Sequence, residues 1–204
     1  MKKVSFPKIV VFINGVIPLV LLLWDLYRKQ VGPNPVEFVT RTTGMLTLVF
    51  LSLTVAITPL RRIFRLNSLV KFRRMVGLFA FFYGSLHLLT YIWFDRVFNF
   101  ISVVGDVVQR PFILVGMTAF LLMVPLAITS TNKTVKRLGG KRWARLHRLV
   151  YLAAIAGVVH FWMLVKSDVR LPLTFAFIVL FLLGYRLLVK YFPSDVTVSR
   201  SIHE

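Results

Sequence analysis

The sequence predicts an all-α membrane protein, a polytopic bundle of six transmembrane helices with both termini in the cytoplasm. Hydrophobic residues make up 57% of its 204 residues, and its mean hydropathy of +0.78 is well above that of an ordinary soluble domain. Several apolar runs are long enough to cross a hydrocarbon core, which takes about 20 helical residues. The basic residues cluster between these runs, as they do in proteins that use them to set membrane orientation.

Each of six apolar runs is expected to be a helix, because a segment inside lipid must satisfy its own backbone hydrogen bonds. A β-barrel would need shorter segments of alternating hydrophobicity, and these runs do not alternate. The length allows one domain, which we expect to comprise residues 1–204. The predicted spans are Ile9–Trp24, Thr43–Leu60, Met75–Phe94, Pro111–Thr129, Leu149–Val165 and Leu171–Val189.

The segments around the spans carry their own signals. The first run follows a basic N-terminus, as in a signal peptide, but no small-residue cleavage site follows it, and we expect a retained span. Between the third and fourth spans, Asp95–Arg110 contains VFNFISVVGDVV, which is typical of a short amphipathic segment on the outer membrane surface. The Gly139-Gly140 doublet marks a turn before the fifth span.

Orientation follows from Lys and Arg. Nineteen of the 26 basic residues fall in the N-terminal tail, the second and fourth loops and the C-terminal end, and the remainder fall in the other loops. The positive-inside rule therefore places both termini in the cytoplasm. No carboxylate lies deep in a span, which argues against an ion-coupled transporter. Five of the seven acidic residues lie on the outer side: Asp25, Glu37, Asp95, Asp106 and Asp168.

Composition also excludes or weakens several other function classes. The net charge of +19 does not indicate nucleic-acid binding, because the basic residues follow the loops and not one soluble face. The absence of cysteine excludes disulfides, iron–sulfur ligation and thiol chemistry. A structural zinc site usually has four ligands, often cysteines, whereas this chain has no cysteine and no carboxylate deep in a span. The sequence shows no Ser–His–Asp grouping, so it gives no support to nucleophilic catalysis.

Three histidines lie in or at the edge of apolar runs, and they predict a haem site. His87 lies 12 residues after Met75, about 18 Å along the third span. His160 lies 13 residues after His147, about 20 Å further along the fifth span. His87 and His160 therefore reach a similar depth toward the outer leaflet, and two such imidazoles can bind one haem iron from both faces. His147 sits at the cytoplasmic edge and could serve a second site, whereas His203 lies in the polar tail.

Small residues leave room beside the outer pair for a large flat cofactor, although ordinary close helix packing also favours small residues. They are Gly77, Ala80 and Gly84 beside His87, and Ala153, Ala156 and Gly157 beside His160. A histidine in a membrane span can likewise serve only to form a hydrogen bond between helices. In a straight helix, His147 and His160 would point to different faces. Either the helix is distorted near its start or the inner site is built differently.

Arginines near the span ends are candidate partners for haem propionates, for a quinone or for a flavin phosphate. Arg73 and Arg74 are the candidates on the inner side, and Arg41 is the candidate on the outer side. The alternative interpretation is that these residues only anchor the protein as positive-inside residues.

Four motifs are specific in combination: NPVEFVTRTTG, TPLRR, FRRMVGLFAFFYGSLH and GKRWARLHRLVYLAAIAGVVHFW. Over nearly its whole length the chain resembles the ferric-reductase-like transmembrane family, and within it the MsrQ haem-binding subunits of bacterial protein-methionine-sulfoxide reductases. Carried over by motif, His87 and His160 match one ligand pair and His147 matches a further ligand. Arg73 and Arg74 stand where the wider family has a second histidine on the third span.

The resemblance implies a multi-pass subunit of the bacterial inner membrane. It would take electrons from the quinone pool and pass them through haem b, one or two per chain, to a periplasmic molybdopterin-containing catalytic subunit. That partner would reduce methionine sulfoxide in oxidised proteins, so catalysis is expected on the partner. The resemblance also implies FMN, for which the sequence shows no signature.

Two alternatives to this function stay open. A self-sufficient ferric or quinone reductase of the same architecture would reduce a small acceptor without a partner. A transporter or membrane scaffold would use its histidines only for packing. The visible spectrum of the purified protein separates both redox functions from the last one.

Overall fold

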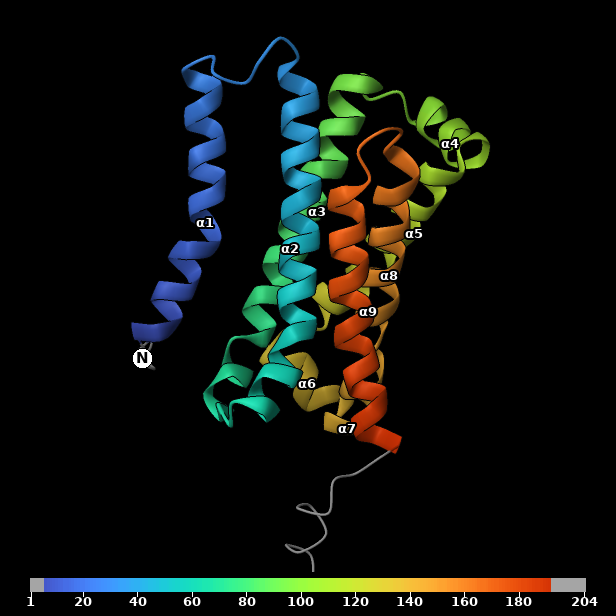
Figure 1. Cartoon of the computed structure of the whole chain (residues 1–204). Coiled ribbons are helices and arrows are strands. Elements are labelled where there is room, and N and C mark those ends of the chain that lie inside the picture. The colour runs from blue at the N-terminus through green and yellow to red at the C-terminus, as the bar shows by residue number, and fades with distance from the viewer. Residues whose placement is uncertain (1–5, 192–204) are drawn as a thin grey trace, which may run out of the picture.

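The computed structural model describes residues 6–191, and all regular structure in that part of the chain is helical. Figure 1 shows the long helices as a bundle with its connections at the two ends. The elements are α1 (Phe6–Tyr27), α2 (Pro35–Ile63), the 3-10 turn η1 (Asn67–Lys71), α3 (Arg73–Thr90), the π-helical η2 (Tyr91–Asp95), α4 (Phe100–Gln109), α5 (Pro111–Ile128), α6 (Asn132–Leu138), α7 (Gly140–Leu146), α8 (Leu149–Leu164) and α9 (Arg170–Tyr191).

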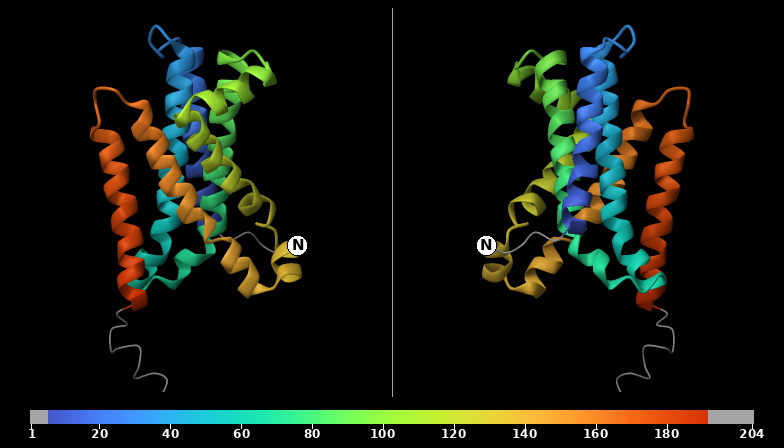
Figure 2. Two further views of the ribbon diagram at one scale, coloured as in Figure 1. Left: turned by 90° about the vertical axis from the view of Figure 1, so that its right-hand side faces the viewer. Right: turned by 90° about the vertical axis from the view of Figure 1, so that its left-hand side faces the viewer.

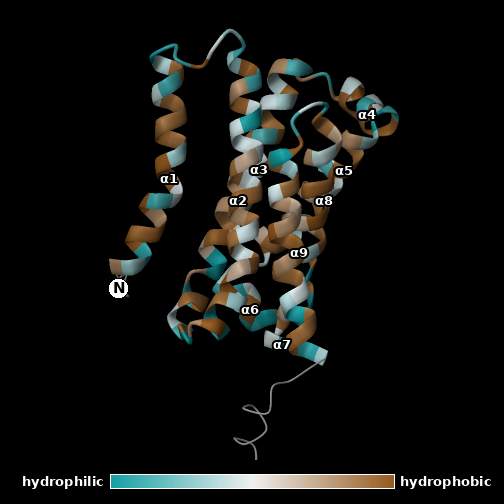
Figure 3. Ribbon diagram, in the orientation of Figure 1, coloured by the Kyte–Doolittle hydropathy of each residue, from teal (hydrophilic) through white to brown (hydrophobic). Residues whose placement is uncertain are grey.

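Six helical segments are long and apolar enough to cross a membrane, which confirms the predicted all-α architecture and its six spans. Apolar residues cover the middle of the helices and polar residues gather toward their ends (Figure 3). The largest boundary difference is at α2, which begins at Pro35 and not at Thr43. Asn34 explains the early start, because its side chain accepts a hydrogen bond from the Glu37 backbone N–H at 3.2 Å and so caps the helix.

α2 is the central helix of the bundle. It packs against α3, α8 and α9, and α5 pairs with α8 (Figures 1 and 2). Four residues of the core between these helices are fully buried, namely Val55, Ala80, Ala153 and Ala154. Three of them are alanines, whose small side chains let the helix backbones approach closely, as membrane helices require.

α1 is the peripheral helix and stands to one side of the bundle (Figure 1). Its buried attachment point is Gly15, against which the Phe79 ring of α3 packs. The hydroxyl of Tyr83, also on α3, donates a hydrogen bond of 2.7 Å to the Gly15 carbonyl. Most other large side chains of α1 are exposed, as expected for a helix that faces lipid.

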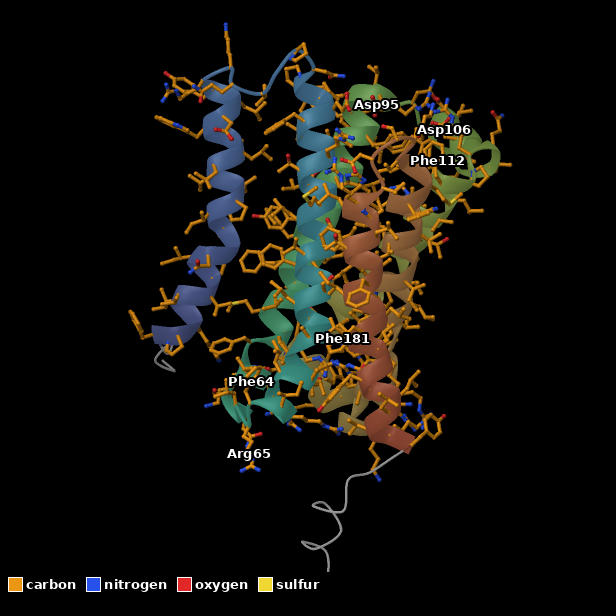
Figure 4. All side chains as sticks on the ribbon, viewed as in Figure 1. Phe64, Arg65, Asp95, Asp106, Phe112 and Phe181 are labelled. Carbon is orange, nitrogen blue, oxygen red and sulfur yellow. The ribbon has the colours of Figure 1, made fainter. Side chains whose placement is uncertain are left out.

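The two ends of the bundle differ in their content of carboxylates, and we name them the acidic end and the basic end for this difference. The acidic end carries the α1–α2, α3–α5 and α8–α9 connections and holds every carboxylate of residues 6–191. The basic end carries the α2–α3 and α5–α8 connections, the start of α1 and the end of α9 (Figure 1). Figure 4 shows Asp95 and Asp106 at the acidic end and Arg65 at the basic end. The other charged residues used for orientation, namely Lys2, Lys3, Asp195, Arg200 and Glu204, and also His203, lie outside the described residues.

Candidate haem-binding site

His87 and His160 are held in the same way by two different helices. His87 lies in the last turn of α3, and its Nδ1 is 2.8 Å from the carbonyl oxygen of Thr40 on α2. His160 lies on α8, and its Nδ1 is 2.6 Å from the carbonyl oxygen of Phe112 on α5. A carbonyl can only accept a hydrogen bond, so each Nδ1 carries the proton. Each Nε2 is therefore left with a free lone pair, which is the form of histidine that binds metals.

The structure brings these two imidazoles together from separate spans. Their ring centroids are 6.1 Å apart, and the ring planes make an angle of 79°. A metal–imidazole bond is about 2 Å long and a ring centroid lies about 1 Å behind its nitrogen, so two rings on one metal have centroids about 6 Å apart. The separation and the free Nε2 atoms fit a haem iron bound from both faces. Crossed ring planes are compatible with such binding, because each ring can rotate about its own bond to the metal.

Two glycines give the imidazoles access to these carbonyls, and sequence reasoning missed both. A Cβ placed on Gly44 would lie 3.0 Å from the His87 ring, and one placed on Gly116 would lie 2.7 Å from the His160 ring. Gly44 follows Thr40 by four residues on α2, and Gly116 follows Phe112 by four residues on α5. In an α-helix, residue i+4 lies directly above the carbonyl of residue i. A side chain at either glycine would therefore occupy the space that the histidine ring takes.

A sequence signal for these glycines exists. Gly44 and Gly116 are each followed by methionine, in TGML of the second span and VGMT of the fourth. The shared Gly-Met dipeptide occurs four residues after each carbonyl that binds a histidine, on α2 and on α5.

The small residues singled out in the sequence have a different role from these glycines. Gly77 faces Thr54 of α2, Gly84 faces Met123 and Thr47, and Gly157 faces Leu48. The atoms that a Cβ would meet at these three positions belong to side chains of neighbouring helices, at 2.9 to 3.6 Å. These contacts support the packing alternative for the small residues.

His147 occupies a separate place at the basic end. It lies between α7 and α8, in the break that separates Leu146 from Leu149. The break supports the first of the two alternatives for the 13-residue spacing, a helix distorted near its start. The His147 Nε2 is 3.1 Å from the hydroxyl of Thr129, and its ring stacks on Trp143 with centroids 3.9 Å apart. Among residues 6–191, no three histidine or acidic side chains gather into a metal-binding cluster.

The three predicted arginines are spread over both ends. Arg73 and Arg74 begin α3 at the basic end, where an Arg74 Nη1 donates to the Asn132 side chain of α6 at 2.5 Å. Arg41 is exposed at the acidic end, 3.7 Å from Glu37. It borders an open, mostly apolar groove of about 500 Å³ along the first turns of α2. The groove is lined by Val31, Pro33, Asn34, Glu37, Phe38, Arg41, Thr42, Met45, Leu46 and Val49.

Arg186 is a further polar residue that the sequence did not single out. Pro59 has no N–H, so the carbonyl of Val55 on the preceding turn of α2 lacks its helical donor. Arg186 of α9 supplies the missing donor at 2.6 Å and also donates to the Tyr151 hydroxyl of α8. Its guanidinium lies 4.8 Å from the centroid of the Tyr151 ring. One arginine thus ties three spans together where a proline leaves a buried acceptor.

Comparison with known proteins agrees with this architecture. The family model described as ferric reductase like transmembrane component matches residues 43–158, a range that includes His87 and His147 and ends two residues before His160. A relative from Herminiimonas arsenicoxydans is 52% identical over 181 residues, which cover 88% of this chain and 83% of the relative.

Two further relatives are similar over comparable lengths. One from Ralstonia nicotianae is 48% identical over 161 residues, covering 79% of this chain and 74% of the relative. One from Azospira oryzae is 45% identical over 186 residues, covering 91% of this chain and 80% of the relative. All three relatives carry the name protein-methionine-sulfoxide reductase heme-binding subunit MsrQ.

Proposed function

This chain belongs to the MsrQ family of ferric-reductase-like membrane subunits, and we propose that it holds haem b between His87 and His160. It is a multi-pass membrane protein, and we propose that residues 1–204 act as one unit in the bacterial inner membrane. Its role is that of the haem-binding electron-transfer subunit of a methionine-sulfoxide reductase system.

The observation that carries the proposal is the matched pair of carbonyl-bound imidazoles 6.1 Å apart. Thr40 and Phe112 hold the Nδ1 protons of the two rings, so neither histidine needs to lose a proton when it binds a metal. The rings come from α3 and α8, and the α2 and α5 backbones fix their orientation before any cofactor enters. A haem with both axial positions filled supplies one-electron transfer and leaves no open position for a substrate.

The donor and the acceptor are proposed from the resemblance and from the position of the site. Electrons come from the quinone pool and leave toward a periplasmic molybdopterin-containing subunit, which reduces methionine sulfoxide in oxidised proteins. The histidine pair supports this direction, because it lies nearer the acidic end, the end that the positive-inside rule assigns to the periplasm. The apolar groove beside Arg41 is our candidate for the quinone site, since it offers apolar walls and polar groups that include the Arg41 guanidinium.

The remaining ligand assignments concern the basic end. We propose His147 as the ligand of a second haem, with Arg73 and Arg74 as partners of its propionates. The number of haems is therefore one or two. FMN is proposed on the family resemblance, with the same two arginines as candidate partners of its phosphate.

Haem content and visible spectra of single-histidine variants test the ligand proposal. We expect the bis-imidazole bands of the purified full-length protein to disappear in His87→Ala and in His160→Ala. The matched control is His147→Ala, which we expect to keep those bands. A colourless but folded wild-type protein, or bands that survive in both His87→Ala and His160→Ala, would contradict the proposal.

A second experiment separates the subunit from a self-sufficient reductase. The haem is reduced with quinol in proteoliposomes, and its reoxidation is followed with and without the purified catalytic subunit and methionine sulfoxide. We expect rapid reoxidation only when both are present. Equal turnover of ferric iron or a small quinone without the partner would favour the self-sufficient reductase.

A further inference from the structure

α4 is a helix with its polar side inward and its apolar side outward. Ile101, Val104 and Val108 recur at three- and four-residue spacing, so they share one helix face. These side chains are 87%, 64% and 79% exposed. Transfer of each such side chain from water into an apolar environment would be favourable by about 1.5–3 kcal/mol. A face of this kind therefore calls for an apolar partner.

The opposite side of α4 is fixed by an acid. Asp106 is the one charged residue of α4 and is only 7% exposed. Its carboxylate pairs with the guanidinium groups of Arg96 and Arg110, the latter at 3.2 Å, and accepts a hydrogen bond from the Tyr91 hydroxyl. Arg96 also donates to Ser102 at 3.3 Å. Because charge neutralisation and hydrogen bonding both hold Asp106 inward, the helix cannot turn its apolar face toward the bundle without exposing these pairs to lipid.

We propose that the apolar face of α4, formed by Ile101, Val104 and Val108, lies in the hydrocarbon of the membrane leaflet at the acidic end. Figure 1 shows α4 at the side of the bundle, below the α1–α2 connection and level with the α8–α9 connection. That is the height at which the spans leave the hydrocarbon core. A helix there with one apolar face can lie in the plane of the interface.

The surroundings of α4 favour lipid as the occupant. The neighbouring spans also expose apolar residues at this end of the bundle, with Trp93 53%, Phe94 55% and Leu114 50% exposed. A tryptophan at this height is typical of a membrane interface. The face itself carries no charge, whereas a surface for a soluble partner is usually bordered by polar groups that give it specificity. The start of α1 and the end of α9 lie at the opposite end of the bundle (Figure 1).

The position of α4 also bears on the proposed haem site, and this step rests on the proposed function. Arg110, which pairs with Asp106, is the N-cap residue immediately before α5. Two residues later, Phe112 provides the carbonyl that holds His160. Figure 4 shows Asp106 and Phe112 at the same end of the bundle. Seating α4 in the leaflet thus fixes the height of the first turn of α5, and with it the carbonyl that orients His160.

Site-directed spin labelling tests the membrane seating directly, because the chain contains no cysteine. Full-length Val104→Cys is labelled and reconstituted in lipid nanodiscs with its haem. The matched control is Gln109→Cys, which is exposed on the same helix but lies about 140° around the helix axis from Val104. We expect the label at position 104 to collide several-fold more with oxygen than with a water-soluble nickel complex. We expect the reverse at position 109.

Each outcome decides the proposal. Equal access of the nickel complex to both labels would overturn it. A label at position 104 that is open to nickel in the nanodisc and becomes protected only when the periplasmic partner is added would also overturn it, and would assign the face to that partner. Ile101→Cys provides a second probe of the same face if Val104→Cys fails to fold. The haem spectrum of each labelled protein is recorded separately, so that failure of the haem proposal is distinguishable from failure of the seating proposal.

Discussion

The histidines at the two ends of this bundle are held differently, and the difference indicates what each can do. His87 and His160 each place Nδ1 against a backbone carbonyl, which can only accept a hydrogen bond. His147 places Nε2 against the Thr129 hydroxyl, which donates its one hydrogen to the Pro125 carbonyl at 2.6 Å and therefore accepts from Nε2. The first arrangement places the proton on Nδ1 and frees Nε2, whereas the second places the proton on Nε2 and so occupies that nitrogen. The pair is therefore prepared to bind metal, and His147 must first give up a contact.

The pair is also held by a repeated device. On both α2 and α5, a carbonyl and a glycine four residues later form the two sides of a slot that receives an imidazole. No equivalent slot surrounds His147, which rests on the Trp143 ring. Changes to the slots should therefore act on the haem proposed between His87 and His160, and changes at the basic end should leave that haem in place.

The largest effect is expected from filling one slot. Gly116→Ala places a methyl group 2.7 Å from the His160 ring, which is too close for carbon, so the ring must leave its carbonyl. We expect loss of most of the bound haem, with a smaller loss for Gly44→Ala, where the distance is 3.0 Å. Gly105→Ala is the control, because a Cβ there meets no atom within 4 Å. Equal haem content in all three variants, measured by absorbance per protein, would refute the slot.

A smaller effect is expected at the arginine that compensates for Pro59. Arg186→Met leaves the Val55 carbonyl without a donor, which costs about 1–3 kcal/mol for a buried polar group. In a Pro59→Ala background the helix regains its own N–H at position 59, so the same change should cost less. Thermal unfolding midpoints of the four proteins measure the difference. An identical cost of Arg186→Met in both backgrounds would show that Val55 is not the relevant acceptor.

A modest effect is expected from releasing His147. Thr129→Val removes the hydroxyl that meets Nε2 and should lower the free energy of unfolding by about 1 kcal/mol. We expect the bands of the His87–His160 site to stay unchanged. A rise in haem per protein in this variant would sharpen the comparison, because it would show that the hydroxyl competes with a second haem for His147.

The smallest effect is expected in the α8–α9 connection, far from His147 and outside the spans. Hydrogen bonds from the side chain and backbone of Arg170 lower the pKa of Asp168 below its ordinary value of 3.8. A carboxyl group whose pKa is lowered by folding stabilises the folded state at pH values above its unfolded-state pKa. This stabilisation is lost as the pH falls through the folded-state pKa. Asp168→Asn should therefore slightly flatten the loss of thermal stability below pH 3.8, with no change in haem spectrum. If the loss of stability at acid pH is unchanged in Asp168→Asn, solvent screens the pairing of these two exposed side chains.

The sequence predicted most of the fold because spans are set by local hydrophobicity. All six spans are present, and the segment VFNFISVVGDVV contains a helix, α4. The early start of α2 was missed because its cap, Asn34, lies outside the apolar run. The two short helices α6 and α7 were missed because nothing apolar distinguishes their basic sequence.

The candidate site was only partly accessible from sequence. Rise along a helix is regular, so His87 and His160 could be matched by depth. Rotation about the helix axis and the identity of the facing backbone are tertiary properties. The shared Gly-Met dipeptide distinguishes Gly44 and Gly116 in the sequence, but their role follows from the histidine rings beside them in the structure. The role of Arg186 follows from a carbonyl 131 positions away.

The most direct test of the central claim is the electron paramagnetic resonance spectrum of the oxidised, purified protein. Two histidines on one iron give a low-spin ferric signal, and the 79° angle between the ring planes predicts the strongly anisotropic form of that signal. We predict that this signal is present in the wild type and in His147→Ala and absent in His87→Ala and His160→Ala. A signal that is lost in His147→Ala and retained in either of the other variants would contradict the account.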